Sequence, residues 1–180
     1  MSHVLLCAGA SVAIYKSCDL ASKLTQAGHA VRTVLTPTAA RLIDPQLFEA
    51  ITGKSAASTE FGSGRRGAMD HIDLARWADI ALVAPCSADL AGRIAGGLAG
   101  DLVTTALLAL EPGVPRLLCP AMNPVMLAHP AVARNLAQLV EDGWTLLEPG
   151  EGHLACGEAG RGRLAEPVDI VERVEALLSG

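Results

Sequence analysis

The sequence has few aromatic and few charged residues: aromatic side chains make up 3% of its 180 residues and charged side chains 18%. It contains no run of about 18 uncharged apolar residues, so it predicts no membrane-spanning helix. The first apolar run begins at residue 3 without a basic flank and a cleavage site, which argues against a signal peptide. The net charge of −5 gives no reason to expect nucleic-acid binding. These absences predict a cytoplasmic globular protein, and its length fits one domain over residues 1–180.

Cysteine is also sparse, and its spacing excludes two kinds of site. The five cysteines are widely separated and form no CxxC pair, so neither a disulfide framework nor a standard zinc site is predicted, and we expect no metal. Cys7, Cys86 and Cys119 lie in or at the end of apolar runs, and Cys18 lies on a predicted helix, where a small buried side chain is expected. Cys156 differs because it lies in a glycine-rich stretch. A reducing cytoplasm suits all five.

The apolar pattern alternates between short strand-like runs and segments with helical spacing. Strands are predicted at residues 4–8, 30–35, 80–84, 115–119 and 145–147. Helices are predicted at residues 12–26, 38–51 with a break at Pro45, 69–79, 90–95, 101–110, 130–141 and 168–178. Strands that alternate with helices indicate an α/β protein with a doubly wound parallel sheet between two helical layers.

Two stretches have the composition of loops. Residues 52–68 are rich in glycine and serine, and we expect a flexible excursion that reaches a neighbouring subunit. Residues 150–164 are polar and glycine-rich, and their position near the end of the last strand makes them a candidate lid over a substrate.

Four of the predicted strands end in turns of small, hydroxyl or amide residues. In an open α/β sheet, ligands bind just beyond the carboxyl ends of the strands. The turn at residues 9–11 lacks the GxGxxG pattern, although Ser11 before a helix suits a phosphate group. In the turn at residues 120–126, Asn123 offers a donor and an acceptor that suit a carboxylate or an amide. Taken singly, the turn at residues 9–11 fits a structural role as well as a ligand, and the turn at 120–126 favours a structural role.

Three longer motifs occur together and in a fixed order. They are HIDLARWAD at residues 71–79, PAMNPVM at 120–126 and ACGEAGRGRL at 155–164, with AIYKSCDL at 13–20 as a fourth similar stretch. In these motifs the sequence resembles the homo-oligomeric flavin-containing cysteine decarboxylases, over residues 4 to about 171. Within that family it is most similar to the branch that decarboxylates 4′-phosphopantothenoylcysteine to 4′-phosphopantetheine in coenzyme A biosynthesis.

The resemblance implies a Rossmann-like sheet of the flavodoxin type and FMN bound where two subunits of a trimer meet. Such trimers often assemble further into dodecamers. The residues that match the family's flavin contacts are Ala10, Ser11, Val12, Thr36, Thr38, Ser87, Ala88, Asp89 and Met122.

The resemblance also implies a catalytic set: His71, Asn123 and Cys156. In the implied reaction, the cysteine end of the substrate is oxidised to a thioaldehyde, which lets CO₂ leave and yields an enethiol. His71 would act as acid or base, Asn123 would orient the carboxylate, and Cys156 would donate a proton when the enethiol is reduced. The implied substrate contacts are Asn123, Met126, Ala155 and Gly157.

Some features depart from the family pattern and keep alternatives open. Ala10 replaces a usual glycine or serine, Asp89 a usual asparagine, and Leu127 a usual aromatic residue. The sequence ends at Gly180 without the cysteine-ligating domain that many bacterial members carry. An alternative is therefore the oxidative decarboxylase of a ribosomal peptide's carboxy-terminal cysteine, which leaves the enethiol as product. A non-catalytic flavoprotein that binds a partner is the third alternative.

Overall fold

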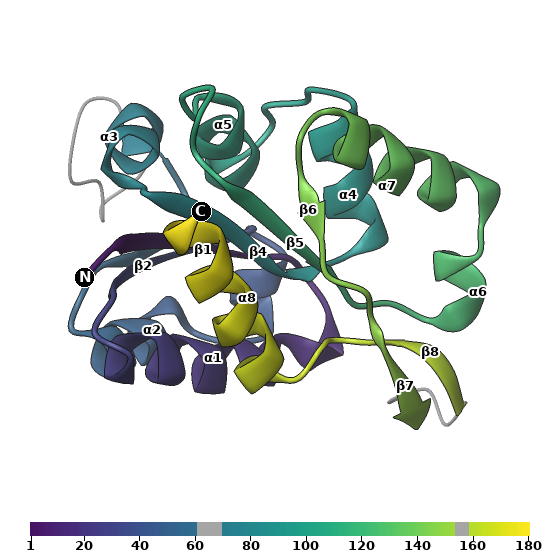
Figure 1. Ribbon diagram of the computed structural model, residues 1–180, viewed down its shortest axis with the longest axis horizontal. Helices are drawn as coiled ribbons and strands as arrows, with labels where there is room; N and C mark the ends of the chain where they lie inside the picture. The colour runs from purple at the N-terminus through teal and green to yellow at the C-terminus, as the bar shows by residue number, and fades with distance from the viewer. Residues whose placement is uncertain (61–69, 154–158) are drawn as a thin grey trace.

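The computed structural model describes residues 1–60, 70–153 and 159–180, which form a parallel sheet between two layers of helices (Figure 1). The sheet has six strands in the order β3-β2-β1-β4-β5-β6, and each neighbouring pair is parallel. Without the two-residue edge strand β3, this is the strand order of flavodoxin-like sheets. The strands are β1 (His3–Ala8), β2 (Ala30–Leu35), β3 (Ala56–Ala57), β4 (Ile80–Cys86), β5 (Arg116–Pro120) and β6 (Thr145–Leu146). The predicted doubly wound α/β fold is confirmed.

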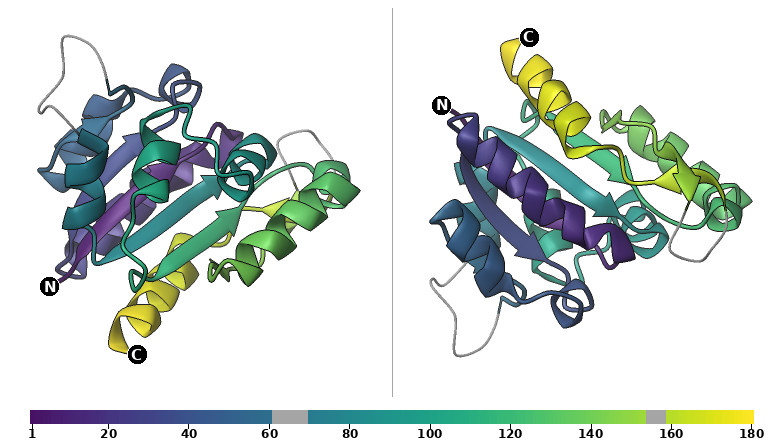
Figure 2. Two further views of the ribbon diagram at one scale, coloured as in Figure 1. Left: turned by 90° about the horizontal axis from the view of Figure 1, so that it is seen from above. Right: turned by 90° about the horizontal axis from the view of Figure 1, so that it is seen from below.

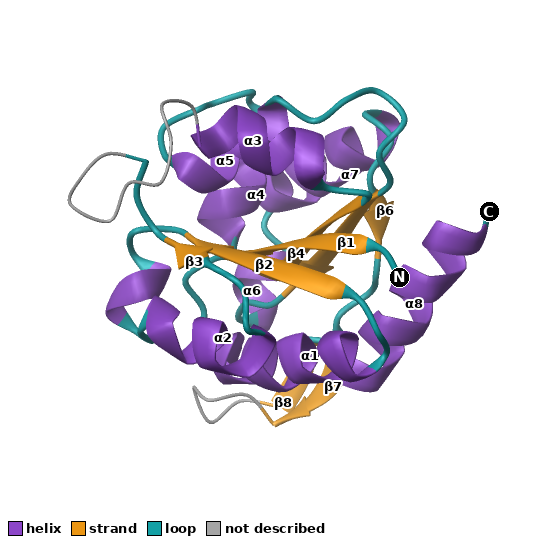
Figure 3. Cartoon of the chain, turned by 90° about the vertical axis from the view of Figure 1, so that its left-hand side faces the viewer, coloured by secondary structure: helices purple, strands orange, loops and turns teal. Residues whose placement is uncertain are grey.

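The helices divide between the two faces of the sheet (Figure 3). One face carries α1 (Tyr15–Gln26), which continues a 3₁₀ turn at Val12–Ile14, together with α2 (Pro45–Thr52) and α8 (Pro167–Ser179). The other face carries α3 (Asp70–Trp77), α4 (Ala88–Ala95), α5 (Leu102–Leu108) and α7 (Pro130–Glu141).

The core consists of two apolar clusters, one on each face of the sheet. Successive side chains of a strand point to opposite faces, so Leu6 of β1 packs in the cluster beneath α1 and α8, whereas Leu5 packs in the cluster beneath α4, α5 and α7. Both side chains are fully buried. Because both faces of the central strands are covered, these strands are continuous apolar runs instead of alternating ones.

Several helices begin with a side chain that accepts a hydrogen bond from the first helical turn. Asp101 is part of a capping box: its side chain accepts from the Thr104 backbone at 2.9 Å, and the Thr104 hydroxyl accepts from the Asp101 backbone N–H. Arg93 of α4 forms an ion pair with Asp101 and a second one with Asp89. This cluster fixes the start of α5 against α4.

Three segments differ from the sequence-based expectation. Pro85 and Cys86, predicted in a turn, belong to β4, and the helix that follows begins at Ala88. The 120–126 segment was expected as a loop, but Pro124–Leu127 form the short helix α6 because Asn123 caps it and Pro124 suits a first helical position. The polar stretch around residue 156, expected as a loop, contains the antiparallel strands β7 (Gly150–His153) and β8 (Ala159–Arg163). Apolar periodicity did not reveal this hairpin because its strands are short and polar.

The structure describes only part of the predicted excursion at residues 52–68. Its first part adds β3 to the edge of the sheet, and residues 61–69 lie outside the described residues. Its reach toward a neighbouring subunit stays a prediction. In the described ranges, no helix has the length and apolar character needed to cross a bilayer.

We expect Asp101→Ala to lower the free energy of unfolding by about 1 kcal/mol at neutral pH, because a helix cap is lost. Burial alone would raise the pKa of Asp101, but hydrogen bonds from Thr104 and Arg93 and the Arg93 charge hold it below the ordinary value. The ionised group therefore stabilises the fold above about pH 4, the ordinary pKa of aspartate, and loses this effect as pH falls through its lower folded pKa.

Urea unfolding of wild type and variant between pH 3 and pH 7 checks this expectation, and the difference should shrink toward the acid end. Asp19→Ala is the control, since Asp19 forms an exposed pair with Lys23 and should cost under about 0.5 kcal/mol. Equal losses for the two variants at neutral pH would contradict the role given to Asp101.

Candidate functional site

The carboxyl ends of β2, β1, β4 and β5 lie side by side at one edge of the sheet, because these strands are parallel neighbours. Strand order reverses between β1 and β4, and this is where an open α/β sheet forms its binding crevice. The two turns there touch: the Gly9 backbone N–H donates to the Pro85 carbonyl at 2.8 Å. A Cβ at Gly9 would lie 3.0 Å from both Pro85 O and a Leu90 methyl carbon. The close approach explains why a glycine follows β1.

The predicted cofactor residues gather at this edge from three turns. Residues 10–12 follow β1, Thr36 and Thr38 follow β2, and residues 87–89 follow β4. Ser11 and Ser87 each cap a helix start, accepting from the backbone of Ala13 at 3.3 Å and of Leu90 at 3.2 Å. The edge therefore presents hydroxyl groups and first-turn amides, which suit phosphate and sugar oxygens.

Thr36 and Thr38 differ in exposure although only one residue separates them. Thr36 is buried and accepts a hydrogen bond from the Ala39 backbone at 3.1 Å, so it shapes the turn after β2. Thr38 is exposed and lies where a ligand can contact it.

Asn123 and Met122 extend the edge beyond β5. The Asn123 Oδ1 accepts from the Val125 backbone at 2.8 Å and caps α6. Met122 is buried, and its backbone N–H donates to the Gly162 carbonyl of β8 at 3.0 Å. Met126, one turn further on, has a side chain that is 49% exposed. The half-buried Asn123 and the exposed Met126 thus belong to a segment that is fixed by β8.

The β7–β8 hairpin is fastened at two places. Against α6 the fit is close, since a Cβ at Gly160 would lie 3.0 Å from Pro124 Cγ. At the base, the buried Lys16 of α1 donates to the Leu164 carbonyl at 3.3 Å and pairs with Glu166 at 2.7 Å. The described strands of the hairpin are therefore tied both to the Asn123 segment and to α1.

Cys156, Ala155 and Gly157 lie outside the described residues. Their predicted roles, and the predicted lid, stay predictions.

His71 lies on α3, at the end of the molecule's long axis opposite to α6 (Figures 1 and 2). The helix ends at the amino edge of the sheet, where the Trp77 ring stacks 4.7 Å from that of His3, so its first turn lies toward the carboxyl edge. One chain therefore does not bring His71 and Asn123 together. Within its own chain, the His71 Nδ1 contacts the Glu60 carboxylate.

The described cysteines do not provide reactive thiols at this edge. Cys7, Cys86 and Cys119 are fully buried, and burial raises the pKa of each thiol far above its ordinary value. Burial also raises the pKa of the half-buried Cys18. Since the thiolate is the reactive form, these side chains act as small hydrophobes, as the sequence predicted. Among the described residues, no cluster of acids, histidines and cysteines could hold a metal ion.

Sequence reasoning missed Glu60 and Lys16. Lys16 carried a signal, because it stands four and eight residues before Leu20 and Leu24 on the apolar face of the predicted helix. A lysine on such a face needs a buried partner. Glu60 carried no comparable signal, since it stands in a stretch without periodicity.

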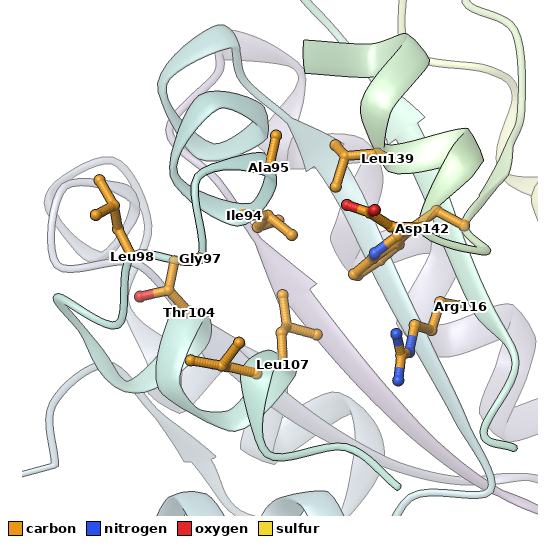
Figure 4. Close-up of a pocket in the computed structure, with 11 residues that line it drawn as sticks. Ile94, Ala95, Gly97, Leu98, Thr104, Leu107, Arg116, Leu139 and Asp142 are labelled. Atoms are coloured by element: carbon orange, nitrogen blue, oxygen red, sulfur yellow. The ribbon is translucent and has the colours of Figure 1, made fainter. Parts of the chain in front are cut away.

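Cavities lie at both edges of the sheet. At the carboxyl edge, a cavity of about 320 Å³ is lined by Pro37, residues 58–60, residues 99–102 and Thr105. A second one of about 270 Å³ lies near the start of β5, with Arg116 and Asp142 on one side and Leu98 and Thr104 on the other (Figure 4). Neither cavity is lined by the predicted site residues themselves, and the carboxyl edge is the candidate site because the turns that carry those residues gather there.

Comparisons with known proteins identify the family of the chain. Residues 1–179 match the family model described as Flavoprotein. The chain is 44% identical over 173 residues to the coenzyme A biosynthesis bifunctional protein CoaBC of Bacillus subtilis, and 37% identical over 176 residues to that of Mycobacterium bovis. These alignments cover 96% and 98% of the chain, but the chain spans only 42% and 41% of the relatives' lengths.

Three solved structures are similar over nearly the whole chain. A PPC decarboxylase mutant complexed with pantothenoylaminoethenethiol has 33% identity and a TM-score of 0.88, covering 99% of both chains. The FMN binding protein AtHal3 has 35% identity and a TM-score of 0.82, covering 97% of this chain and 95% of that one. The FMN-dependent cysteine decarboxylase SpaF has 28% identity and a TM-score of 0.84, covering 100% and 98%.

We expect Gly160→Val to destabilise the protein by roughly 1–3 kcal/mol, because the added side chain overlaps Pro124 and pushes β8 from α6. Thermal unfolding should show a lower Tm than wild type. Gly150→Val is the matched control: it lies in the partner strand of the same hairpin, and a Cβ there meets no atom within 4 Å. A wild-type Tm for Gly160→Val would refute the close fit.

Proposed function

The chain belongs to the Flavoprotein family, and from this premise we propose that it is an FMN-dependent decarboxylase of substrates that end in cysteine. The substrate we propose is 4′-phosphopantothenoylcysteine, which would yield 4′-phosphopantetheine for coenzyme A synthesis. One observation carries the proposal: the turns after β1, β2, β4 and β5 lie together at the carboxyl edge of the sheet, around the point where strand order reverses. The similarity to CoaBC proteins and to a PPC decarboxylase supports the choice of substrate.

The residues at the carboxyl edge fit FMN. Ser11 and the amides of the turn after β1 suit the phosphate, and Ser87 with the first-turn amides of α4 suits hydroxyl groups. Asp89 adds a negative charge beside α4, which favours ribityl hydroxyls over phosphate at that turn. Val12 is 67% exposed and Tyr15 is 64% exposed, which gives the same edge apolar surface for a ring system. The similar structures named as FMN proteins support this assignment.

Bound FMN supplies the oxidation of the substrate's cysteine end and the return of two electrons after CO₂ has left. Residues of the chain itself bind the substrate and transfer the protons. Asn123 orients the substrate carboxylate, since its amide can donate to an oxygen in a fixed plane. His71 takes up and returns a proton, which an imidazole can do near neutral pH. Cys156 supplies the last proton, and the similar PPC decarboxylase mutant complexed with an ethenethiol supports an enethiol on the reaction path.

The separation of His71 from Asn123 implies that two copies of the chain build each site. A homotrimer whose sites lie at the subunit interfaces accounts for this separation. It does so whether or not the trimers assemble further into a dodecamer. Exposed apolar side chains in the segments that follow β1, β2 and β5 support a contact surface at the same edge: Val12, Tyr15, Leu42, Val125 and Met126. We further propose a cytoplasmic location, which the free thiols of the four described cysteines support.

A peptide ending in cysteine is the second candidate substrate. The similarity to SpaF, named as an FMN-dependent cysteine decarboxylase, supports it, as does Leu127, which departs from the aromatic residue often found there in the family. In that reaction the enethiol is released, so an external acceptor must reoxidise the flavin.

Anaerobic incubation with 4′-phosphopantothenoylcysteine tests the two candidates, followed by mass analysis and a flavin spectrum. We expect many turnovers, a product lighter by one CO₂, and flavin that is oxidised at the end. A product lighter by CO₂ and two hydrogens, with bleached flavin after one turnover, would support the peptide reaction. If neither this compound nor cysteine-ending peptides lose CO₂, the proposed function is wrong.

We expect His71→Asn to bind FMN with an unchanged absorbance spectrum and to lose at least about 100-fold in CO₂ release, because a proton-transfer group is removed. His129→Asn is the control, since His129 caps α7 through a bond from the Ala131 backbone and an asparagine can do the same. Normal turnover by His71→Asn would remove His71 from the reaction.

A further inference from the structure

The contact between Glu60 and His71 joins two segments that sequence reasoning did not connect. Glu60 follows the edge strand β3, and His71 lies in the first turn of α3. The Glu60 Oε1 meets the His71 Nδ1, and both side chains are largely enclosed, with 17% and 24% of their surface exposed. A carboxylate and an imidazole held together in this way restrict the orientation of the ring.

The pairing also selects a tautomer. An ionised carboxylate can only accept hydrogen bonds, so the proton on the neutral ring must reside on Nδ1. The Nε2 atom then carries the lone pair and is the nitrogen that can take up a proton. A histidine without such a partner exchanges between its two neutral tautomers, and only one of them could act as a base through Nε2.

The position of Glu60 favours a role in the site over a role in folding alone. Glu60 lines the cavity of about 320 Å³ at the carboxyl edge, together with Pro37 and Gly100. The neighbouring acid in this cavity, Asp101, is already engaged by Arg93 and Thr104. Glu60 is therefore the carboxylate in this cavity that contacts His71, the proposed proton-transfer group.

We propose that Glu60 is the positioning residue for His71: it holds the imidazole in the Nδ1–H tautomer and presents Nε2 to the substrate. This proposal rests on the proposed function, in which His71 transfers a proton. It adds to that function a carboxylate–histidine pair within one chain, which acts on a substrate held by Asn123 of another.

The first test reads the tautomer directly and does not depend on activity. The sequence contains five histidines, so ¹⁵N-histidine labelling gives few signals, and His71→Asn identifies the one from His71. We expect long-range ¹H–¹⁵N spectra at pH 8 to show the Nδ1–H form in wild type and a shift toward the Nε2–H form in Glu60→Ala. An unchanged tautomer in Glu60→Ala would overturn the proposal.

The second test compares kinetics. We expect Glu60→Ala to lower kcat about 10- to 100-fold, as is typical when the group that orients a working histidine is lost, with KM and the FMN spectrum unchanged. Glu60→Gln should recover part of the loss, because its amide oxygen still accepts from Nδ1–H. Asp73→Asn is the matched control, since it removes one charge from the exposed face of the same helix.

The double variant separates positioning from a general structural effect. If Glu60 acts through His71, Glu60→Ala adds no further loss to His71→Asn. Additive losses, or full activity of Glu60→Ala, would overturn the proposal. Failure of the proposed function is seen separately, as an inactive wild-type protein or an active His71→Asn, and in that case the tautomer measurement still decides whether Glu60 positions the ring.

Discussion

The contact between the turns after β1 and β4 is the constraint on which the site depends. Gly9 donates to the Pro85 carbonyl, and no side chain fits between the two turns. Because strand order reverses at this point, the helices that follow β1 and β4 leave the sheet on opposite faces and open a crevice between their first turns. The serine caps of these helices, Ser11 and Ser87, therefore flank the same crevice.

A second constraint is the distribution of the proposed catalytic groups along the sheet. The Asn123 segment follows β5 and is fixed by β8 through Met122, whereas His71 lies on α3, at the other end of the molecule's long axis from α6. A parallel sheet separates side chains that belong to strands several positions apart, and no side chain spans that distance. The proposed homotrimer would supply from a second copy what one copy lacks, and the exposed apolar residues at the carboxyl edge offer it a contact surface.

Much of the fold and part of the site could be predicted from the sequence. The strand at residues 30–35 and the helix at 130–141 agree with the structure residue for residue, because strong apolar periodicity with clear stops determines both. The turns in which the cofactor residues are predicted also lie where the sequence placed them, since each directly follows such a strand. The β7–β8 hairpin and α6 were not, because short polar strands and a one-turn helix have no periodic signal, and their pairing depends on packing against Pro124.

The sequence by itself therefore determined how the main strands and helices succeed one another along the chain, and the buried state of Cys7, Cys86 and Cys119. These properties follow from local patterns of apolar, small and hydroxyl residues. Only the tertiary structure decided that Glu60 meets His71, that Lys16 is buried against Glu166, and that His71 and Asn123 lie apart. Such relations join residues distant in sequence, and they arise from strand order and packing, which no local pattern encodes.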